Sequence, residues 1–576
     1  MVASRQICSS VKRMRGIVPI VYLVLAVLIG TGFLTRQSPE AASAAPGFPD
    51  KPRVLVNTSF PASGGKIIQV AKGGDLQQAI NAARPGTTLV LEPGAAYTGN
   101  FRLPETKPNN TGAEGWIIIR SGAPDSALPA GKRVQSSQAA AMPKLITPNA
   151  GAVLATEPAA HHFRLIGIEL TIAPNVAAVN DLITLGDGSN HQNKPALVPH
   201  DLIIDRCYIH GSSTANAKRG IALNSASTAV IDSYLSDFHC SGADSQAICG
   251  WNGPGPFTIA DNYVEAAGEN LMFGGADPSI DGLIPSDIEI THNDFTKPVD
   301  WKAGRQGRST PHWTVKNLLE LKNACRAAID GNTFENSWVD GQTGFAIVIK
   351  SVNQDGGAPW CLTHDVSFTN NLVRHAAAGI SLLGRENQQT EHCTNRILIY
   401  NNLFEDIGAA AWGGVGRLFE IASGPAAGDG RSGPRDLHID HNTAFQTQHI
   451  ILASEYDSSL KAYGAASGFV FTNNIVIHNQ YGVFGDNGGG IGSPAIKNYF
   501  PGALFKRNVL IGGQKSSYPD ENFFPGAIPD VGFSDPTHGD YALASSSPFK
   551  KRGSDGLDIG CDISELHRHI GTGPGA

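Results

Sequence analysis

Two lysines, a glutamate and an arginine in the second half of the chain could carry acid–base chemistry. They are Lys322, Lys350, Glu320 and Arg385. Two ammonium groups held about 5 Å apart repel each other, which favours the neutral form of one of them, and a neutral amine can act as a base. Glu320 would oppose that effect. The residues therefore leave open both a catalytic base and an ordinary ion-pair patch on a strand.

Polar residues gather a second time between residues 244 and 281. Carboxylates on oxygen-rich loops would suit Ca²⁺, although the same acids could be ordinary loop residues. The candidate calcium ligands are Asp244, Glu269 and Asp277. An aromatic face for stacking on a sugar ring and several hydrogen-bonding groups accompany them. These candidate substrate-binding residues are Trp251, Gln246, Asn270 and Glu420.

A short recurring phrase indicates which elements position these residues. It reads apolar-x-apolar-x-x-Asn-x-apolar, and its asparagines are Asn262, Asn293, Asn332, Asn371, Asn402, Asn442, Asn474 and Asn508. Leu202 to Cys207 keeps the frame with Cys in the Asn position, and Ala229 to Tyr234 keeps it with Tyr. Such a repeat, with loops of unequal length, is typical of a solenoid of stacked coils.

A second apolar strand follows the phrase in each unit and would carry the charged residues. We align as inward pairs Leu271/Phe273, Leu319/Leu321, Ile347/Ile349, Ile380/Leu382 and Phe419/Ile421. One outward column then holds Met272, Glu320, Val348, Ser381 and Glu420, and the next holds Gly274, Lys322, Lys350, Leu383 and Ala422. Because parallel strands stack about 4.8 Å apart, the alignment predicts Lys322 and Lys350 on adjacent coils with Glu320 beside them and Arg385 nearby.

The chain resembles right-handed parallel β-helix proteins of the pectin lyase-like superfamily over residues 66–562. The resemblance lies in the opening GDLQQAINAARPGTTLVLEPGAAYTGNF, the Asn phrases and the closing YALASSSPFKKRGSDGLDIGCD. It implies an all-β fold, a right-handed parallel β-helix or solenoid, with a short N-terminal capping helix over residues 74–83. It also implies that the asparagines form a ladder of amide hydrogen bonds at a sharp corner, where Asn tolerates a left-handed conformation.

The activity that the resemblance implies is open. Many members of the superfamily are polysaccharide lyases, while others are hydrolases, epimerases or tailspike-like binding proteins, and the fold does not choose among them. The GHG and RIK signatures of polygalacturonases and the WIDH and RxPxxR phrases of pectate lyases are missing.

Three hypotheses follow from these observations. The first is an exported polysaccharide lyase that cleaves a uronic-acid glycan by β-elimination, with Lys350 or Lys322 as the base and Ca²⁺ or Arg385 stabilising the developing charge. The second is a glycoside hydrolase of the same fold, and the third is a non-catalytic surface protein that binds glycans.

The ends of the chain and its net charge indicate where the protein is located and which partners it has. Residues 1–44 combine a basic flank, an apolar run over 17–34 and Ala-Ser-Ala, which predicts a signal peptide or an N-terminal membrane anchor and therefore export. Residues 45–65 are predicted as a linker and residues 563–576 as a flexible tail. The body is expected to be a monomer that meets a membrane only through the N-terminal segment. A net charge of −7 without a basic stripe argues against a nucleic-acid partner.

The cysteines of the exported part suggest disulfide bonds rather than a metal site. Cys361 and Cys393 precede equivalent strands of consecutive units, and Cys240 and Cys249 are close in the chain, so both pairs are candidate disulfides. No CxxC or His-Cys spacing that predicts zinc is present.

Overall fold

The computed structural model describes residues 47–61, 65–106, 115–302, 312–385, 391–423, 433–457 and 462–571. The predicted signal peptide or anchor lies outside these residues. From Ala44 onward the chain forms one compact unit. Among the described residues, no helix has the length and apolar character needed to cross a membrane.

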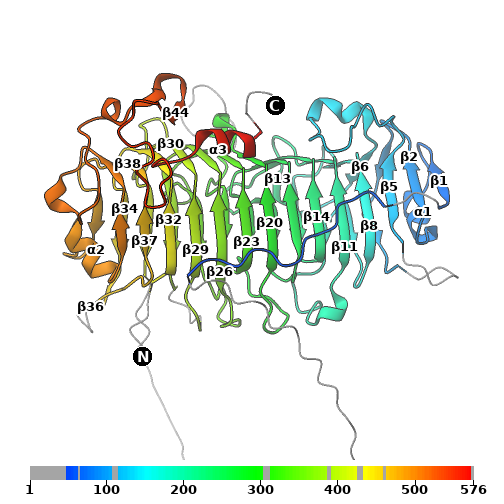
Figure 1. The fold of residues 1–576 in the computed structure, drawn as a ribbon. Coiled ribbons are helices and arrows are strands. Elements are labelled where there is room, and N and C mark those ends of the chain that lie inside the picture. The colour runs from blue at the N-terminus through cyan, green and yellow to red at the C-terminus, as the bar shows by residue number, and fades with distance from the viewer. Residues whose placement is uncertain are drawn as a thin grey trace, which may run out of the picture. The chain divides into compact units, whose positions relative to one another are not determined.

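Three long sheets stack their strands coil upon coil (Figure 1). Sheet A contains, in order, β1 (Ile67–Val70), β2 (Thr88–Leu91), β5 (Ile117–Ser121), β8 (His161–Ile166), β11 (His200–Asp205), β14 (Ala226–Ile231), β17 (Phe257–Ala260), β20 (Ser286–Thr291), β23 (Ala324–Asp330), β26 (Thr363–Thr369), β29 (Asn395–Tyr400), β32 (Arg435–Asp440), β37 (Val470–Thr472) and β41 (Leu504–Lys506).

Sheet B follows sheet A after a sharp corner in each coil. It contains β3 (Ala96–Thr98), β6 (Lys144–Thr147), β9 (Glu169–Ile172), β12 (Tyr208–His210), β15 (Tyr234–Phe238), β18 (Tyr263–Ala266), β21 (Asp294–Thr296), β24 (Thr333–Ser337), β27 (Leu372–Ala376), β30 (Leu403–Ile407), β33 (Thr443–Gln446), β38 (Ile475–Ile477) and β42 (Val509–Ile511).

Sheet C completes each coil and carries the lysine-bearing strands. It contains β4 (Phe101–Leu103), β7 (Leu154–Thr156), β10 (Ala178–Leu185), β13 (Asn216–Leu223), β16 (Gln246–Gly250), β19 (Glu269–Phe273), β22 (Leu319–Leu321), β25 (Phe345–Lys350), β28 (Ala378–Leu383), β31 (Phe419–Ala422), β34 (Ile451–Ser454), β39 (Val483–Gly485) and β40 (Gly490–Ile491). Every recorded pair in the three sheets is parallel except the last, β39 with β40. The architecture is that of right-handed parallel β-helix proteins, as predicted.

The asparagines of the recurring phrase form a continuous ladder at the corner between sheets A and B. Asn293 illustrates the pattern: its amide nitrogen donates to Asn332 Oδ1 at 3.0 Å and to Ile259 O at 2.8 Å. All eight predicted asparagines are buried, and Asn522 extends the ladder by one step beyond Asn508. Because each amide is satisfied within the wall, these residues are structural.

Two details of the corner differ from the prediction. The left-handed residue is the one before each ladder position, for example His292 with φ 56° and Asn370 with φ 53°, and not the asparagine itself. In the earlier coil Ser233 holds the ladder position, since Cys207 N donates to its hydroxyl, so the frame that placed Tyr there is wrong by one residue. A one-residue shift moves a side chain to the other face of the strand.

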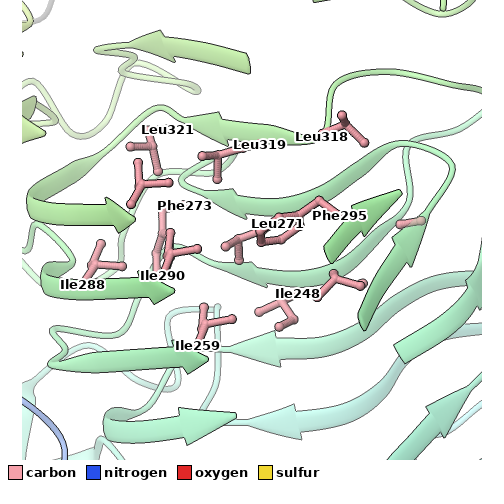
Figure 2. Packing of buried hydrophobic residues seen from close by; sticks show 14 of the residues in the cluster. Ile248, Ile259, Leu271, Phe273, Ile288, Ile290, Phe295, Leu318, Leu319 and Leu321 are labelled. Carbon is pink, nitrogen blue, oxygen red and sulfur yellow. The ribbon is translucent and has the colours of Figure 1, made fainter. Parts of the chain in front are cut away.

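Apolar residues of the three sheets fill the interior of the coils. Figure 2 shows side chains such as Ile259, Leu271 and Ile290 from different strands meeting inside the coils. These residues have no exposed surface and belong to one cluster that runs from Val70 to Tyr518. The alternation of inward and outward residues therefore fixes which side chains of sheet C reach its outer surface.

The terminal segments of the β-helix differ in part from their predictions. The predicted N-terminal helix is present as α1 (Leu76–Ala82), with Leu76 and Ile80 packed on the core. A further helix, α2 (Ser493–Tyr499), packs on the last coils. Residues 563–576 were predicted as a flexible tail, whereas the structure has the helix α3 (Ile563–His569) there, since Ile563 and Leu566 pack on Leu372 and Leu403.

The segment predicted as a linker lies along the outside of sheet A as a strap (Figure 1). We call residues 47–61 the strap. The backbone N–H of Asp50 donates to Asp365 Oδ1 at 2.9 Å, and that of Arg53 donates to Asp287 Oδ1 at 2.8 Å. Val56 is buried between strap and sheet. The strap therefore crosses several coils and is anchored to their corner carboxylates.

The predicted disulfides are not present. Cys240, Cys249 and Cys361 are buried free thiols, so neither the Cys240–Cys249 pair nor a bond from Cys361 to Cys393 exists. Burial raises the pKa of Cys249 to about 12, with smaller opposing effects from neighbouring cations. Neither closeness in the chain, for Cys240 and Cys249, nor equivalent positions in consecutive units, for Cys361 and Cys393, was enough to predict a bond, because a disulfide also requires a specific geometry of the two side chains.

Candidate functional site

The sheet C register is the one that the sequence predicts. Leu271 pairs with Leu319, which pairs with Ile347, and the alignment continues to Ile380 and Phe419. The outward residues therefore stack in columns across the coils. One column brings Glu320 between Met272 and Val348.

Glu320 lies between the two lysines and contacts both. Its Oε1 is 3.5 Å from Lys322 Nζ and 3.3 Å from Lys350 Nζ, and its Oε2 accepts a hydrogen bond from Asn317 Nδ2 at 3.1 Å. The Glu320 side chain has no exposed surface, whereas Lys322 and Lys350 keep 16% and 18% of theirs. We call Glu320, Lys322 and Lys350 the lysine cluster. It presents two ammonium groups to solvent above one buried carboxylate.

A glycine makes room for this arrangement. Gly274 has φ 99°, and a Cβ at that position would lie 2.7 Å from Lys322 Cβ. Any larger residue there would displace the lysine. The missing side chain at Gly274 is therefore needed for Lys322 to take this position.

A second buried carboxylate, Glu269, extends the cluster toward the preceding coils. It is 3.5 Å from Lys316 Nζ and accepts a hydrogen bond from Gln246 Nε2 at 2.7 Å. Burial and the neighbouring charge of Glu320 raise the pKa of Glu269. Burial would also raise the pKa of Glu320, but Lys322 and Lys350 outweigh it and hold that pKa below its usual range. The pKa of Glu320 therefore lies below that of Glu269.

A buried lysine supports the cluster from inside the wall. Lys297 Nζ contacts Ala266 O, Ala267 O, Gly268 O, Asn270 Oδ1 and Asn317 O at 2.6–3.2 Å. Burial lowers the pKa of Lys297 to about 7, while Glu269 and Glu265 oppose this effect. Five oxygen acceptors match an ammonium with three donors better than a neutral amine. Lys297 thereby ties the turn that precedes Glu269 to the backbone at Asn317 in the next coil.

Several predicted substrate-binding residues have structural partners. Asn270 is fully buried, donates to Val264 O and Thr296 O, and accepts from Lys297, so it does not face a substrate. The Trp251 ring lies under the Arg219 guanidinium at 5.0 Å, and its Nε1 donates to Gly188 O.

The Trp251 ring is also closed on the side of Gly188. A Cβ on Gly188 would lie 2.0 Å from the ring, so the indole packs directly on that glycine. Trp251 is therefore a packing residue rather than an open sugar platform. Gln246 is buried and serves to hold Glu269.

The two remaining predicted residues lie away from the lysine cluster. Arg385 donates to Glu391 O at 3.2 Å and lines a cavity of about 540 Å³ with residues of sheet A strands, among them His364 and Arg435. Glu420 shares the outward column of Glu320, in register with Ser381, and is paired with Arg417 at 2.5 Å. Neither contacts the lysine cluster. The prediction of Arg385 counted strand positions beyond the end of β28.

The proposed calcium ligands do not form one site. Lys316 Nζ lies 2.6 Å from Asp244 Oδ2 as well as 3.5 Å from Glu269, so an ammonium already occupies the place between these two acids. Asp277 instead accepts hydrogen bonds from the backbone of Asp355 and Gly357. The donor set therefore does not fit a Ca²⁺ ion, and we derive no step through one.

Sequence reasoning did not find Lys316, Asn317 and Lys297. Lys316 and Asn317 lie just before β22. The alignment of inward and outward residues began at Leu319 and therefore did not include them. Lys297 follows β21 of sheet B and enters from the corner. The sequence signal was a lysine directly after a short strand, and a lysine side chain is costly to bury unless oxygen acceptors surround it.

Comparisons with known proteins show similar folds at low similarity. No protein-family model and no curated protein matches the chain. Among solved structures, an alginate lyase of polysaccharide lyase family 6 is 14% identical with a TM-score of 0.41, covering 86% of this chain but only 58% of its own. A mannuronic acid specific family 6 lyase from human gut microbiota is 13% identical with a TM-score of 0.48 (79% and 88% covered).

A phage protein with the same kind of fold also matches. A tailspike protein of an E. coli bacteriophage is 12% identical with a TM-score of 0.45, covering 79% of this chain and 66% of its own. These values are too low to carry an argument about activity.

Proposed function

We propose that the protein is a polysaccharide lyase that cleaves a uronic-acid glycan by β-elimination at the lysine cluster. The observation that carries the proposal is that two partly exposed ammonium groups on adjacent coils share one fully buried carboxylate. Such a pair can bind the carboxylate of a sugar and supply a base next to it.

The elimination divides the work between the two lysines. One lysine, in its neutral form, takes the proton from the carbon next to the sugar carboxylate. The electron pair released forms a carbon–carbon double bond as the bond to the glycosidic oxygen breaks, and that oxygen takes up a proton from the other lysine or from water. The second ammonium neutralises the carboxylate while charge develops on it. Glu320, which has no exposed surface, positions both amines without touching the glycan.

The hydrolase alternative fits the geometry less well. Hydrolases of this kind need two carboxyl groups that reach the sugar, about 5–5.5 Å or 6.5–9.5 Å apart. The partly exposed Asp244 is paired with Lys316. The two buried acids of this region, Glu269 and Glu320, have 1% and 0% exposed side chains and are held by Gln246, Asn317 and the lysines. They can tune the amines, but they cannot contact a glycan.

Product chemistry tests the proposal. The purified protein is incubated, with and without EDTA, with a panel of polyuronates and neutral polysaccharides, and the absorbance of unsaturated uronates and the reducing ends are followed together. Unsaturated product supports elimination; reducing ends without it would support hydrolysis; retained binding without product would support a glycan-binding protein.

We expect Lys322→Met and Lys350→Met each to abolish most of the product, and the exposed control Lys132→Met to leave it unchanged. Full activity in both cluster variants would refute the proposal.

Export belongs to the same proposal. A polymeric glycan stays outside the cell membrane, and the segment 1–44 has the composition of an export signal. Fractionation of cells that make the full chain tests this, and a protein found only in the cytoplasm would contradict it.

A further inference from the structure

The corner that leads into sheet A carries a column of charged residues from coil to coil. In the later coils two acids of the column, Asp287 and Asp365, are neutralised by arginines. Arg326 binds Asp287 at 2.7 and 3.0 Å, and Arg396 binds Asp365 at 2.6 and 2.5 Å. All four residues have a left-handed backbone. Acids and arginines therefore alternate along this part of the column, from Asp287 to Arg396.

The first coils of this column carry histidines in place of arginines. His162 and Asp201 hold the corner positions, with φ 60° and 53°, and the register pairs His161 with His200 just before them. His200 Nδ1 lies 2.6 Å from Asp201 Oδ2, and His162 Nδ1 lies 4.0 Å from the same oxygen. One ligand atom from each of His162, His200 and Asp201 falls within 4.8 Å of the others.

No permanent cation neutralises this corner in the part of the chain that the structure describes. The recorded partners of Asp201 are His200, His162 and Ser227, whose hydroxyl donates to Oδ1 at 2.8 Å. Burial would raise the pKa of Asp201, but the hydrogen bonds from His200 and Ser227 and the nearby His162 hold it below its usual range. The group is thus a carboxylate facing two imidazoles.

The cluster also opens into a cavity. A cavity of about 450 Å³ is lined by His162, Asp201, Trp116 and strap residues that include Asn57 and Ser59. Elsewhere the strap covers corner carboxylates with its own N–H groups. The side chains of His162, His200 and Asp201 remain 19%, 42% and 33% exposed, so an ion can reach them from solvent.

We propose that His162, His200 and Asp201 bind one Zn²⁺ ion. Two imidazoles and a carboxylate are ligands that zinc prefers, and three protein ligands leave a fourth position for water on the cavity side. The present 2.6 Å contact is a hydrogen bond, shorter than the separation of about 3.3 Å between ligand atoms on a tetrahedral zinc. Binding therefore moves the His200 proton from Nδ1 to Nε2 and places the metal between ring and carboxylate.

The chain contains a matched control for this site. Cys325, His364 and Asp365 form a similar cluster five coils further along, and their ligand atoms also lie within 4.8 Å of one another. His364 and Asp365 match His200 and Asp201, while Cys325 matches His161, the neighbour of His162. There Arg326 donates to Cys325 Sγ at 3.0 Å, and Arg396 donates to His364 Nδ1 at 3.0 Å and to Asp365. Because two guanidinium groups fill the place of a cation, this second cluster should not bind zinc.

Zinc titration of the untagged full chain, stripped of metal, tests the proposal. Affinity is measured by competition with a chromophoric chelator, and Co²⁺ is used as a probe whose absorption reports tetrahedral nitrogen and oxygen ligation. The variants are His162→Asn and Asp201→Asn, because asparagine tolerates the left-handed backbone. The control is His364→Asn in the arginine-filled cluster, and circular dichroism confirms that each variant is folded.

We expect one zinc per chain in the parent protein and in His364→Asn, and binding weaker by roughly tenfold or more in the two site variants. The proposal is overturned if the parent binds no zinc, if both site variants bind like the parent, or if His364→Asn removes binding. Lyase activity is not needed for any of these readouts, and the lysine cluster lies on sheet C. Failure of the zinc site is therefore distinct from failure of the proposed function.

Discussion

Replacing the buried Lys297 by methionine should loosen the coils that hold the lysine cluster. Methionine has a similar length and no charge, so it leaves the volume filled but removes all donors. Lys297 contacts five oxygens, and of these Ala267 O keeps a second donor, the Lys316 N–H at 3.0 Å. All five acceptors, among them Asn270 Oδ1 and Gly268 O, lose a charged partner.

The magnitude follows from these contacts. Removing one partner of a buried charge typically costs about 3–5 kcal/mol, and each buried acceptor left unsatisfied costs about 1–3 kcal/mol. Because the freed loops can relax toward water, we take about 3–5 kcal/mol as the local loss. At about 1.4 kcal/mol per factor of ten, this corresponds to a roughly 100- to 4000-fold fall in local protection.

Native-state hydrogen exchange is the suitable measurement, since a long repeat protein need not unfold in one step. Amides of β18, β19 and β22 should lose protection in Lys297→Met, whereas those of the distant β32 should not. Lys132→Met, at an exposed position, serves as the matched control. Protection in β19 that stays within a few fold of the parent would refute the idea that the ammonium holds this corner.

Three further predictions concern the wall of the β-helix. Asn332→Ala should destabilise the adjacent coils by about 2–4 kcal/mol, because the bonds that the Asn332 side-chain amide donates and accepts are lost, while Asn190→Ala at an exposed position should be neutral; local hydrogen exchange compares them. Cys207 and Cys249, whose pKa burial raises to about 12, should react with a thiol reagent only after unfolding, and a disulfide-linked peptide containing either would contradict this. Burial raises the pKa of Glu265 to about 7, so the folded state holds its proton more tightly than the unfolded chain. The stability that Glu265 contributes should be fully present below about pH 4.5 and fall by up to about 3 kcal/mol as the pH rises to about 7, and Glu265→Gln should remove that fall in the local opening free energy of β18, measured by hydrogen exchange in a pH series.

The sequence allowed the register of sheet C to be predicted, because two simple rules determine it. The Asn ladder repeats once per coil, and side chains alternate between interior and surface, so Glu320, Lys322 and Lys350 could be placed together before any coordinates. The same rules failed for Arg385, which lies beyond the end of a regular strand. Beyond the end of β28 the direction of a side chain depends on the path of the loop and no longer on the strand alternation.

The residues that complete the site could not be read from the repeat. Lys316 approaches Glu269 from the stretch before β22, and Lys297 enters from sheet B, so both depend on loop paths that the period does not encode. Trp251 shows the converse error. Its type and position suggested an open sugar platform, but Arg219 and Gly188 close on the ring, and these contacts come from other coils.

The placement of Glu320 argues for function more strongly than the presence of the lysines does. Its register neighbours in the same column are Met272 and Val348, so apolar residues are fully compatible with this position. A buried carboxylate with ion partners rarely adds stability over a well-packed apolar residue of similar size. Placing one beneath two partly exposed amines therefore makes little sense as stabilisation of the wall. It does make sense as a way to hold two like charges close together at a surface where a carboxylate-bearing polymer can bind.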